Sequence, residues 1–335
     1  MSPRSRVTIR DVAARAGVSH QTVSRVINNS ERVSPETRAR VKAVIEELGY
    51  RPNAIARSMS LGRTCMLACI APNLRDYTFA CLIEGAEAKV REHGYFLLSS
   101  SARDEEVFAE IIEQLVESRR ATALMVINPY IDLRYTQLPK NFPYVFVGSR
   151  SQDESIPSIK LNDELAAYEA TKHLIKLGHR RIAMVTGPMV EDPAQDRCEG
   201  FDRALSEAGI ELDPSMVIEG DWSGTSGIDA LMLLAEEGQL PTAVFGQNDR
   251  MAIGVIQAAR QMGISVPKQL SVIGVDDIPL ASYFDPPLTT MRQDIVEIGR
   301  QAAQLLIDLL EQPEVMPRHV SLKATLVIRS STHPV

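Results

Sequence analysis

The chain of 335 residues contains no run of 18 uninterrupted apolar residues, and its arginine-rich N-terminus has no apolar segment of the secretory type. We therefore expect neither a membrane span nor export, and we expect a cytoplasmic protein. The four cysteines have neither the spacing of a zinc site nor that of a disulfide framework. Three of them, Cys65, Cys69 and Cys81, lie in apolar segments, which predicts buried free thiols.

Motifs of the common enzymes are also lacking. The chain has no Gly-x-Gly-x-x-Gly after a strand, no Walker loop, no Gly-x-Ser-x-Gly and no His-Glu-x-x-His. The six histidines do not cluster as metal ligands. We therefore expect no catalytic residues, no cofactor and no metal, and keep an α/β enzyme only as a remote alternative.

Charge is distributed unevenly along the chain. Residues 1–63 contain 12 Lys and Arg against 5 Asp and Glu, a balance of +7, whereas the remainder contains 24 against 38, a balance of −14. A basic head on an acidic body predicts that the first sixty residues bind a polyanion such as nucleic acid and that the body does not.

The segment 18–28 reads as a short helix with one apolar face. Ser19 is a good N-cap, and Val23, Val26 and Ile27 recur at helical spacing. The outward side chains include glutamine, which pairs with adenine, and arginine, which pairs with guanine. These outward residues are His20, Gln21, Thr22, Ser24 and Arg25.

A second short helix, 9–16, precedes it across Gly17. Thr8 and Asp11 have the spacing of a capping box. Two short helices joined by a glycine turn predict a helix-turn-helix, with an ordinary helical hairpin as the alternative. A third helix opens with Ser34 as N-cap and Pro35 at its first position, and it runs to residue 48. A marginal helix, 53–60, is either a linker or a segment that folds against a partner.

These residues resemble the head and hinge of the lactose/galactose-repressor (LacI/GalR) family. The matching motifs are Thr8-Ile9-Arg10-Asp11-Val12-Ala13, Ala16-Gly17-Val18-Ser19, Thr22-Val23-Ser24-Arg25-Val26, Gly49-Tyr50-Arg51-Pro52-Asn53 and Ala56-Arg57-Ser58. The resemblance implies that two hinge helices pair in the minor groove, with Met59 where the family has an intercalating leucine. Methionine is still an apolar wedge that is able to kink DNA.

On this basis we expect twelve residues to contact DNA. His20 reads as a base or phosphate contact, with a solvated surface histidine as the alternative. The set is Thr8, Ser19, His20, Gln21, Thr22, Ser24, Arg25, Asn28, Asn53, Ala56, Arg57 and Met59.

From residue 65 the pattern changes to short apolar strands alternating with helices. Repeated units of this kind predict a doubly wound parallel sheet, and about ten of them exceed one sheet, so two α/β lobes are expected. The family resemblance extends here and implies a periplasmic-binding-protein-like body. We expect a DNA-binding domain over 1–62 (helix-turn-helix 7–50, hinge 53–60) and an effector-binding and dimerisation domain over 63–335. Its lobes are expected at about 63–161 with 293–322, and at about 162–292 with 323–330.

Polar and aromatic side chains follow the expected strand ends, where a cleft between lobes would lie. Arg, Asp and Asn side chains hydrogen-bond paired hydroxyls and Trp offers a flat apolar face, which suits a sugar. For Asp249, a helix cap and a ligand contact are equally expected. Asp277 is expected to be a loop residue. The expected effector contacts are Asp76, Tyr77, Arg197, Trp222, Asn248, Asp276 and Gln293; the resemblance places all but Asp76 and Tyr77 on effector-contacting positions.

The resemblance implies a homodimeric repressor of a near-palindromic operator, controlled by a small molecule such as a sugar or sugar derivative. The alternatives are a purine-like corepressor or a protein co-regulator. The residues do not decide between inducer and corepressor. The chain ends without a leucine-heptad tail, so a dimer is expected rather than a tetramer.

Overall fold

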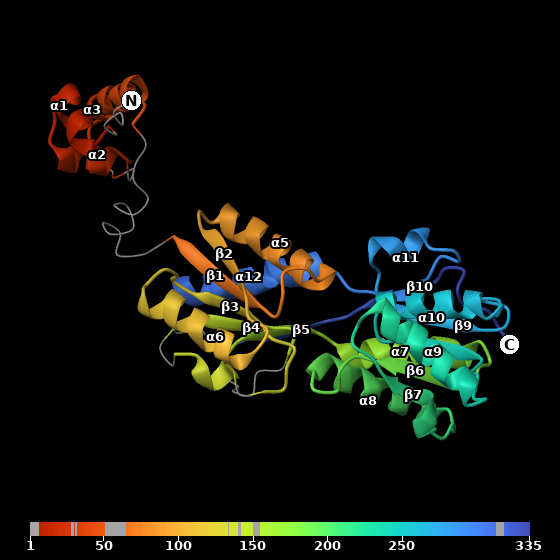
Figure 1. Ribbon diagram of the computed structural model, residues 1–335. Helices are drawn as coiled ribbons and strands as arrows, with labels where there is room; N and C mark the ends of the chain where they lie inside the picture. Colours follow the sequence, from red (N-terminus) through yellow and green to blue (C-terminus); the bar gives the residue numbers. More distant parts are fainter. Residues whose placement is uncertain are drawn as a thin grey trace, which may run out of the picture. The chain divides into compact units, whose positions relative to one another are not determined.

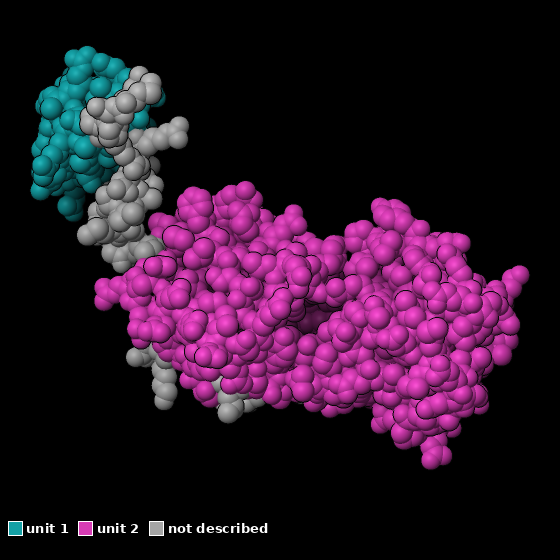
Figure 2. Space-filling view, viewed as in Figure 1, with its two compact units in different colours: residues 1–64 teal, residues 65–335 magenta. Residues whose placement is uncertain are grey.

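The computed structural model describes residues 7–27, 30, 32–50, 65–132, 134–139, 142–149, 155–312 and 318–335. Contacts divide the chain into two compact units, residues 1–64 and 65–335 (Figure 2). The expected hinge helix 53–60 lies outside the described residues, as do five of the expected DNA contacts: Asn28, Asn53, Ala56, Arg57 and Met59.

The first unit is built from three short helices around one small core. These are α1 (Ile9–Ala16), α2 (His20–Ile27) and α3 (Pro35–Leu48). Val12, Val23 and Val41, one from each helix, are fully buried. Gly17 ends α1 with a φ of 64°, which a residue lacking Cβ adopts without strain. The predicted capping box and all three predicted helices are confirmed.

The second unit contains two α/β lobes, each built on a six-stranded sheet of described residues (Figure 1). In the N-lobe every strand pair is parallel, in the order β11-β5-β4-β3-β1-β2. The bounds are β1 (Met66–Ala71), β2 (Phe96–Ser101), β3 (Leu124–Ile127), β4 (Tyr144–Val147), β5 (Ser158–Leu161) and β11 (His319–Leu322). Helices α5 (Tyr77–Glu92) and α12 (Ile295–Glu311) cover one face, and α6 (Glu105–Ile112) with the π-helical turn η1 (Glu113–Glu117) covers the other.

The C-lobe sheet has the order β12-β10-β9-β8-β6-β7, and only the β10–β12 pair of its described strands is antiparallel. Its strands are β6 (Ile182–Thr186), β7 (Val217–Glu219), β8 (Ala243–Gly246), β9 (Ser271–Asp276), β10 (Thr289–Arg292) and β12 (Thr325–Val327). One face packs on α7 (Asp163–Lys176) and α8 (Asp192–Glu207). The other packs on α9 (Gly224–Glu236), α10 (Asp249–Gln261) and α11 (Pro279–Tyr283).

The chain passes between the lobes three times, after β5, after β10 and after β11. Consequently each lobe contains segments that are distant in sequence, and the carboxyl ends of both sets of parallel strands can line one cleft. The predicted fold class is confirmed. No helix among the described residues combines the length and apolarity that a membrane crossing requires.

The sequence pattern missed β5, β10 and α11. β5 and β10 are only four residues long, and β10 reads Thr-Thr-Met-Arg, which lacks the apolar run that marks the other central strands. The helical segment after β2 is not one regular helix, because α6 is followed directly by the π-helical turn η1.

Candidate functional site

The exposed side of α2 carries the polar residues expected to contact DNA. Ser19 caps the helix, because its Oγ accepts a hydrogen bond from the backbone N of Thr22 at 3.1 Å. His20, Gln21 and Arg25 are exposed, whereas Thr22 and Ser24 are half-buried. The outer surface of this helix therefore offers both bidentate base-reading side chains, glutamine and arginine.

Thr8 is the N-cap of α1 and forms a capping box with Asp11. Its Oγ1 donates to Asp11 Oδ2 at 2.7 Å, and its backbone N donates to the same carboxylate at 2.8 Å. These hydrogen bonds lower the pKa of the Asp11 carboxyl. Thr8 is exposed, so the cap holds the start of α1 without burying the hydroxyl.

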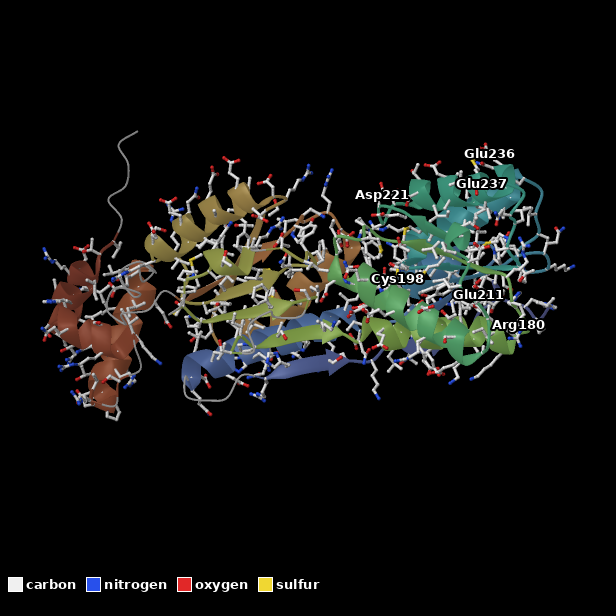
Figure 3. The ribbon with its side chains drawn as sticks, turned by 90° about the horizontal axis from the view of Figure 1, so that it is seen from below. Arg180, Cys198, Glu211, Asp221, Glu236 and Glu237 are labelled. Atoms are coloured by element: carbon white, nitrogen blue, oxygen red, sulfur yellow. The ribbon has the colours of Figure 1, made fainter. Side chains whose placement is uncertain are left out.

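In the second unit, a cavity of about 300 Å³ lies between the two lobes. Figure 2 shows a hollow in the surface of this unit between its two halves. Six of the seven expected effector contacts line the cavity, although they come from both lobes: Asp76, Arg197, Trp222, Asn248, Asp276 and Gln293. In Figure 3, Asp221 lies on the side of the C-lobe that faces the N-lobe, whereas Arg180, Glu211, Glu236 and Glu237 lie toward its far end.

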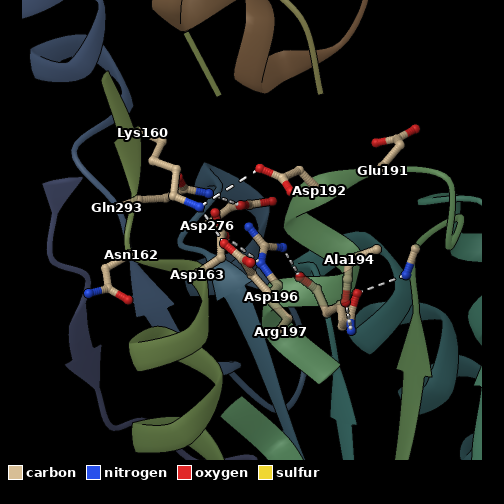
Figure 4. A network of polar contacts seen from close by, with 12 residues as sticks. Lys160, Asn162, Asp163, Glu191, Asp192, Ala194, Asp196, Arg197, Asp276 and Gln293 are labelled. Carbon is tan, nitrogen blue, oxygen red and sulfur yellow. Dashed lines mark hydrogen bonds and ion pairs between the residues drawn. The ribbon is translucent and has the colours of Figure 1, made fainter. Parts of the chain in front are cut away.

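Arg197 projects from α8 into the centre of a polar network (Figure 4). Its Nε donates to Asp163 Oδ1 at 2.8 Å, and its Nη1 donates to the backbone carbonyl of Gln247. Burial raises the pKa of the Asp163 carboxyl, and the Arg197 charge opposes that shift. The two hydrogen bonds fix the orientation of the Arg197 guanidinium group. Its remaining N–H groups would be the donors to a ligand.

Asp276 ends β9 and is only 8% exposed. Gln293 Nε2 donates to its Oδ1. Burial raises the pKa of this carboxyl to about 6, and Arg197 opposes the shift. A carboxylate beside an arginine presents acceptors and donors together, which suits two neighbouring hydroxyl groups.

Trp222 forms the flat wall between these polar groups. Its indole Nε1 donates to Glu191 Oε2 at 2.9 Å, and the Arg197 guanidinium lies 5.5 Å from its ring. Asn248 Nδ2 donates to the Trp222 carbonyl, while Asn248 Oδ1 accepts from Met251 N as the N-cap of α10. The cap therefore also positions the tryptophan.

The apolar part of the cavity lining comes mainly from the N-lobe. Phe79 and Leu82 from α5, Ile127 from β3, Val147 from β4 and Ile295 from α12 contribute to it. A ligand that fills this cavity would place hydroxyl groups against the C-lobe and a less polar surface against the N-lobe.

Tyr77 is the expected contact that does not line the cavity. Its side chain is 40% exposed, and Cys81 lies within hydrogen-bonding reach of its hydroxyl. Burial is the largest cause raising the pKa of Tyr77 to about 12. The carboxylates of Asp276 and Asp277 also raise this pKa, so Tyr77 lies near the cavity that its neighbours Asp76 and Thr78 line.

Asp249 is neither the expected cap nor a lining residue. Asn248 provides the cap, and the carboxylate of Asp249 is fully buried behind it. It accepts from Thr290 Oγ1 at 2.5 Å and from Ile278 N at 2.8 Å. Burial, followed by the neighbouring Asp276, raises its pKa. Asp277 is a loop residue, as expected, and pairs with Arg292 and Arg329.

Sequence reasoning missed five charged residues that line the cavity: Lys160, Asp163, Glu191, Asp221 and Arg250. Lys160 lies on the missed strand β5 and bonds Asp196 of α8, so it joins the two lobes. Asp163 and Arg250 follow Asn162 and Asp249 at helix starts, where an acid or a base reads as a surface residue. Among the described residues no group of His, Cys, Asp and Glu side chains is arranged to hold a metal ion.

Comparisons with known proteins fit this architecture. The family model for bacterial regulatory proteins of the lacI family matches residues 8–53, and that for the periplasmic binding protein-like domain matches 171–332. Catabolite control protein A of Priestia megaterium is 35% identical over 330 residues, with 97% of this chain and 99% of the relative covered. The ribose operon repressor of Escherichia coli strain K12 is 36% identical over 328 residues, with the same coverage of each chain.

A solved structure is similar over the same length. The Lac repressor dimer bound to operator and the anti-inducer ONPF matches with a TM-score of 0.91 at 30% sequence identity. The match covers 98% of this chain and 100% of that chain.

Proposed function

Because the chain belongs to the lacI family of bacterial regulatory proteins, we propose that it is a homodimeric repressor whose operator affinity is set by a small hydroxylated molecule in its interlobe cavity. One observation carries the proposal: a base-reading helix and a ligand-sized polar cavity occur in the same chain. The head supplies the DNA contacts, and the body supplies the sensor.

On DNA, we assign sequence reading to Gln21 and Arg25, with His20 at a base or a phosphate. Their exposure on α2 supports this assignment. A homodimer would present two such helices to the half-sites of a near-palindrome. The segment 53–60, with Met59 as the wedge, would order on the bent operator, so operator binding would include the cost of folding it.

In the cavity, we assign hydroxyl recognition to Arg197, Asp276 and Asn248, and ring stacking to Trp222. The geometry of fixed donors and acceptors beside an indole supports a sugar or sugar derivative. A purine-like corepressor remains the second candidate, because the same indole would stack on a flat base. By linkage, the ligand must bind the DNA-free and DNA-bound forms with different affinity.

We propose binding without catalysis. The inner carboxylates are engaged in fixed interactions, Glu191 with the Trp222 indole and Asp276 with Gln293. That arrangement supports positioning of a ligand more than proton transfer to it. Because bacterial operator DNA lies in the cytoplasm, we propose that the protein acts there.

The proposal is tested by titrating the full chain with sugars, sugar acids, sugar phosphates and purines while following fluorescence. Trp222 is the only tryptophan of the sequence, so a saturable change reports on the cavity. Operator binding is measured in parallel by anisotropy, with and without the responsive compound. Asp276→Ala should retain operator binding and lose the ligand response. A normal response in that variant would contradict the cavity assignment.

A further inference from the structure

A second cavity of about 570 Å³ opens next to the first and has a different electrostatic character. The two share five lining residues: Pro72, Asn73, Asp76, Tyr130 and Arg250. The outer cavity also includes Arg75 and Arg103, which the inner cavity does not. Three guanidinium groups therefore surround the outer cavity, against a single carboxylate.

The fold brings these residues together from separate segments. Arg75 follows β1, Arg103 follows β2 and Tyr130 follows β3, all at the carboxyl ends of parallel strands of the N-lobe. Arg250 comes from the first turn of α10 in the C-lobe. The outer cavity therefore spans both lobes, at the edge of a parallel sheet where ligands commonly bind.

Local hydrogen bonds fix the backbone that carries these side chains. Asn73 Oδ1 accepts from the backbone N of Arg75 at 3.0 Å. The carbonyl of Arg103 accepts from Arg134 Nη2 at 3.1 Å, and the Arg134 guanidinium lies 4.3 Å from the Tyr130 ring. The side-chain guanidinium groups of Arg75 and Arg103 are exposed and have no partner among the described residues.

The inner cavity has the opposite arrangement of charge. Its cations are already paired, Arg197 with Asp163 and Lys160 with Asp196. Glu191 and Asp276 add negative charge at its wall. An anionic group in the inner cavity would be repelled by Glu191 and Asp276. The same group in the outer cavity would be attracted by the guanidinium groups of Arg75 and Arg103.

We propose that the outer cavity is an anion subsite in which Arg75 and Arg103 bind a phosphate group, with Arg250 closing it from the other lobe. This inference rests on the proposed function, and it makes the effector a phosphorylated sugar derivative rather than a neutral sugar. Guanidinium pairs match phosphate oxygens bidentately, which a lysine does not. A bound phosphate would also compete with Asp76 for Arg250, an ion pair that joins the lobes.

Two sources of phosphate are chemically equivalent here. The group belongs either to the effector itself, as a phosphate ester whose sugar occupies the inner cavity, or to a free inorganic anion that binds beside a neutral sugar. Both predict the same dependence on Arg75 and Arg103. They differ in whether a neutral sugar and the anion bind independently.

The test is calorimetric titration of the full chain with matched pairs: ribose and ribose 5-phosphate, glucose and glucose 6-phosphate, cellobiose and its 6′-phosphate. Inorganic phosphate and pyrophosphate are titrated alone. The variants are Arg75→Gln, Arg103→Gln and the double variant. Arg120→Gln is the matched control, because Arg120 is an exposed N-lobe arginine that lines neither cavity.

We expect at least one phosphate compound to bind about tenfold or more tightly than its neutral parent. That advantage should decrease with added salt, disappear in the double variant and persist in Arg120→Gln. Inorganic phosphate that binds alone with the same sensitivity would support the subsite and identify the free anion as its occupant. A phosphate advantage that survives the double variant would overturn the proposal, as would the absence of binding by every anion tested.

Operator binding is also measured for each protein without ligand. This measurement distinguishes failure of the anion subsite from failure of the proposed regulatory function. The arginine variants should bind operator as the unmodified chain does. If the unmodified chain binds no operator, the regulatory function fails whatever the anion data show. If operator binding responds to a neutral sugar and no anion binds, the regulatory function stands and the anion subsite fails.

Discussion

At the residue scale, three non-glycine residues beside the cavity adopt backbone conformations that side chains rarely take. Trp222 has a φ of 66°, Asp276 of 117° and Asp277 of 59°. Such positions cost roughly 1–3 kcal/mol each and persist only where neighbouring contacts hold them. Asn248 bonds the Trp222 carbonyl, and Arg292 and Arg329 hold Asp277. The strained turns aim the indole and the Asp276 carboxylate into the cavity.

The first prediction at this scale concerns Arg25 in the recognition helix. Its exposure leaves the N–H groups of the guanidinium accessible to a guanine edge. Arg25→Ala should lose preference at one or two base pairs of the operator, by roughly 1–3 kcal/mol each. Binding to a library of operator variants measures it. A uniform weakening across all sequences would show that Arg25 contacts only phosphate.

A second prediction follows from the burial of Asp276. Its pKa in the folded protein is about 6, above the ordinary value of 3.8 for this carboxyl. The stability supplied by the protonated form is therefore complete below the ordinary pKa and is lost as pH rises through about 6. Asp276→Asn, which is always neutral, should raise the free energy of unfolding by about 1–3 kcal/mol at about pH 8 and change it little at about pH 4.

Thermal unfolding of the ligand-free protein at both pH values measures the difference. Asp277→Asn is the control, because Asp277 forms ion pairs with Arg292 and Arg329 and its neutralisation should destabilise near pH 8. An equal effect of Asp276→Asn at the two pH values would contradict the assigned cause.

At the element scale, pairs of helices in the body approach one another at glycines. A Cβ on Gly299 of α12 would lie 2.0 Å from the Leu82 carbonyl of α5, and one on Gly85 of α5 would lie 2.1 Å from the Val296 carbonyl of α12. Backbone atoms cannot move away as a flexible side chain would. These two helices therefore pack at a distance that only glycine permits on both sides.

We accordingly predict that Gly299→Ala destabilises the protein, although alanine is the better helix former by about 1 kcal/mol. Overpacking of this kind costs typically about 1–3 kcal/mol. Urea unfolding measures the change. Gly224→Ala is the matched control, because its nearest neighbour to a new Cβ is the Arg250 carbonyl at 3.4 Å. Stabilisation by Gly299→Ala would refute the close-packing account.

At the scale of the second unit, polar contacts tie the two lobes together on both sides of the cavity. Arg250 pairs with Asp76, and Lys160 pairs with Asp196. Backbone bonds add to these, from Asp192 N to the Pro129 carbonyl at 2.8 Å and from Ile131 N to the Val190 carbonyl at 3.1 Å. A ligand that strengthens or weakens these contacts would change the relative stability of lobe arrangements.

The same unit exposes large apolar side chains that a dimer would cover. Phe96 on the edge strand β2 is 71% exposed, and Leu280 and Tyr283 on α11 are 47% and 80% exposed. Figure 1 shows α5 and α11 on the same side of the two lobes. An interface that covers this side of both lobes would bury all three side chains.

We predict that Tyr283→Glu combined with Phe96→Glu shifts the protein from dimer to monomer and weakens operator binding, because two heads are no longer linked. Sedimentation velocity over a concentration series measures the shift. Leu240→Glu, at an apolar side chain 42% exposed in the turn after α9, is the control and should leave the assembly intact. A double variant that sediments as the unmodified chain does would exclude this face as the interface.

The sequence by itself determined the local structure and the regulatory class. The capping box at Thr8, the apolar spacing of α2 and the alternation of strands and helices are short-range patterns, and short-range patterns decide local structure. Six of the residues expected to contact an effector line the cavity, as their places after strands predict, because parallel strands end at one edge of a sheet. Tyr77, the seventh expected contact, does not line the cavity, and its contact with an effector stays a prediction.

Only the tertiary structure decided which side chains meet. Arg197 and Asp163 are 34 positions apart, and Arg250 and Asp76 are 174 positions apart. Neither pair follows from local periodicity, because each depends on the three passages of the chain between the lobes. The separation of charge between the inner and outer cavities arises in the same way. The sequence contains the arginines, and packing decided which of them have carboxylate partners and which have none among the described residues.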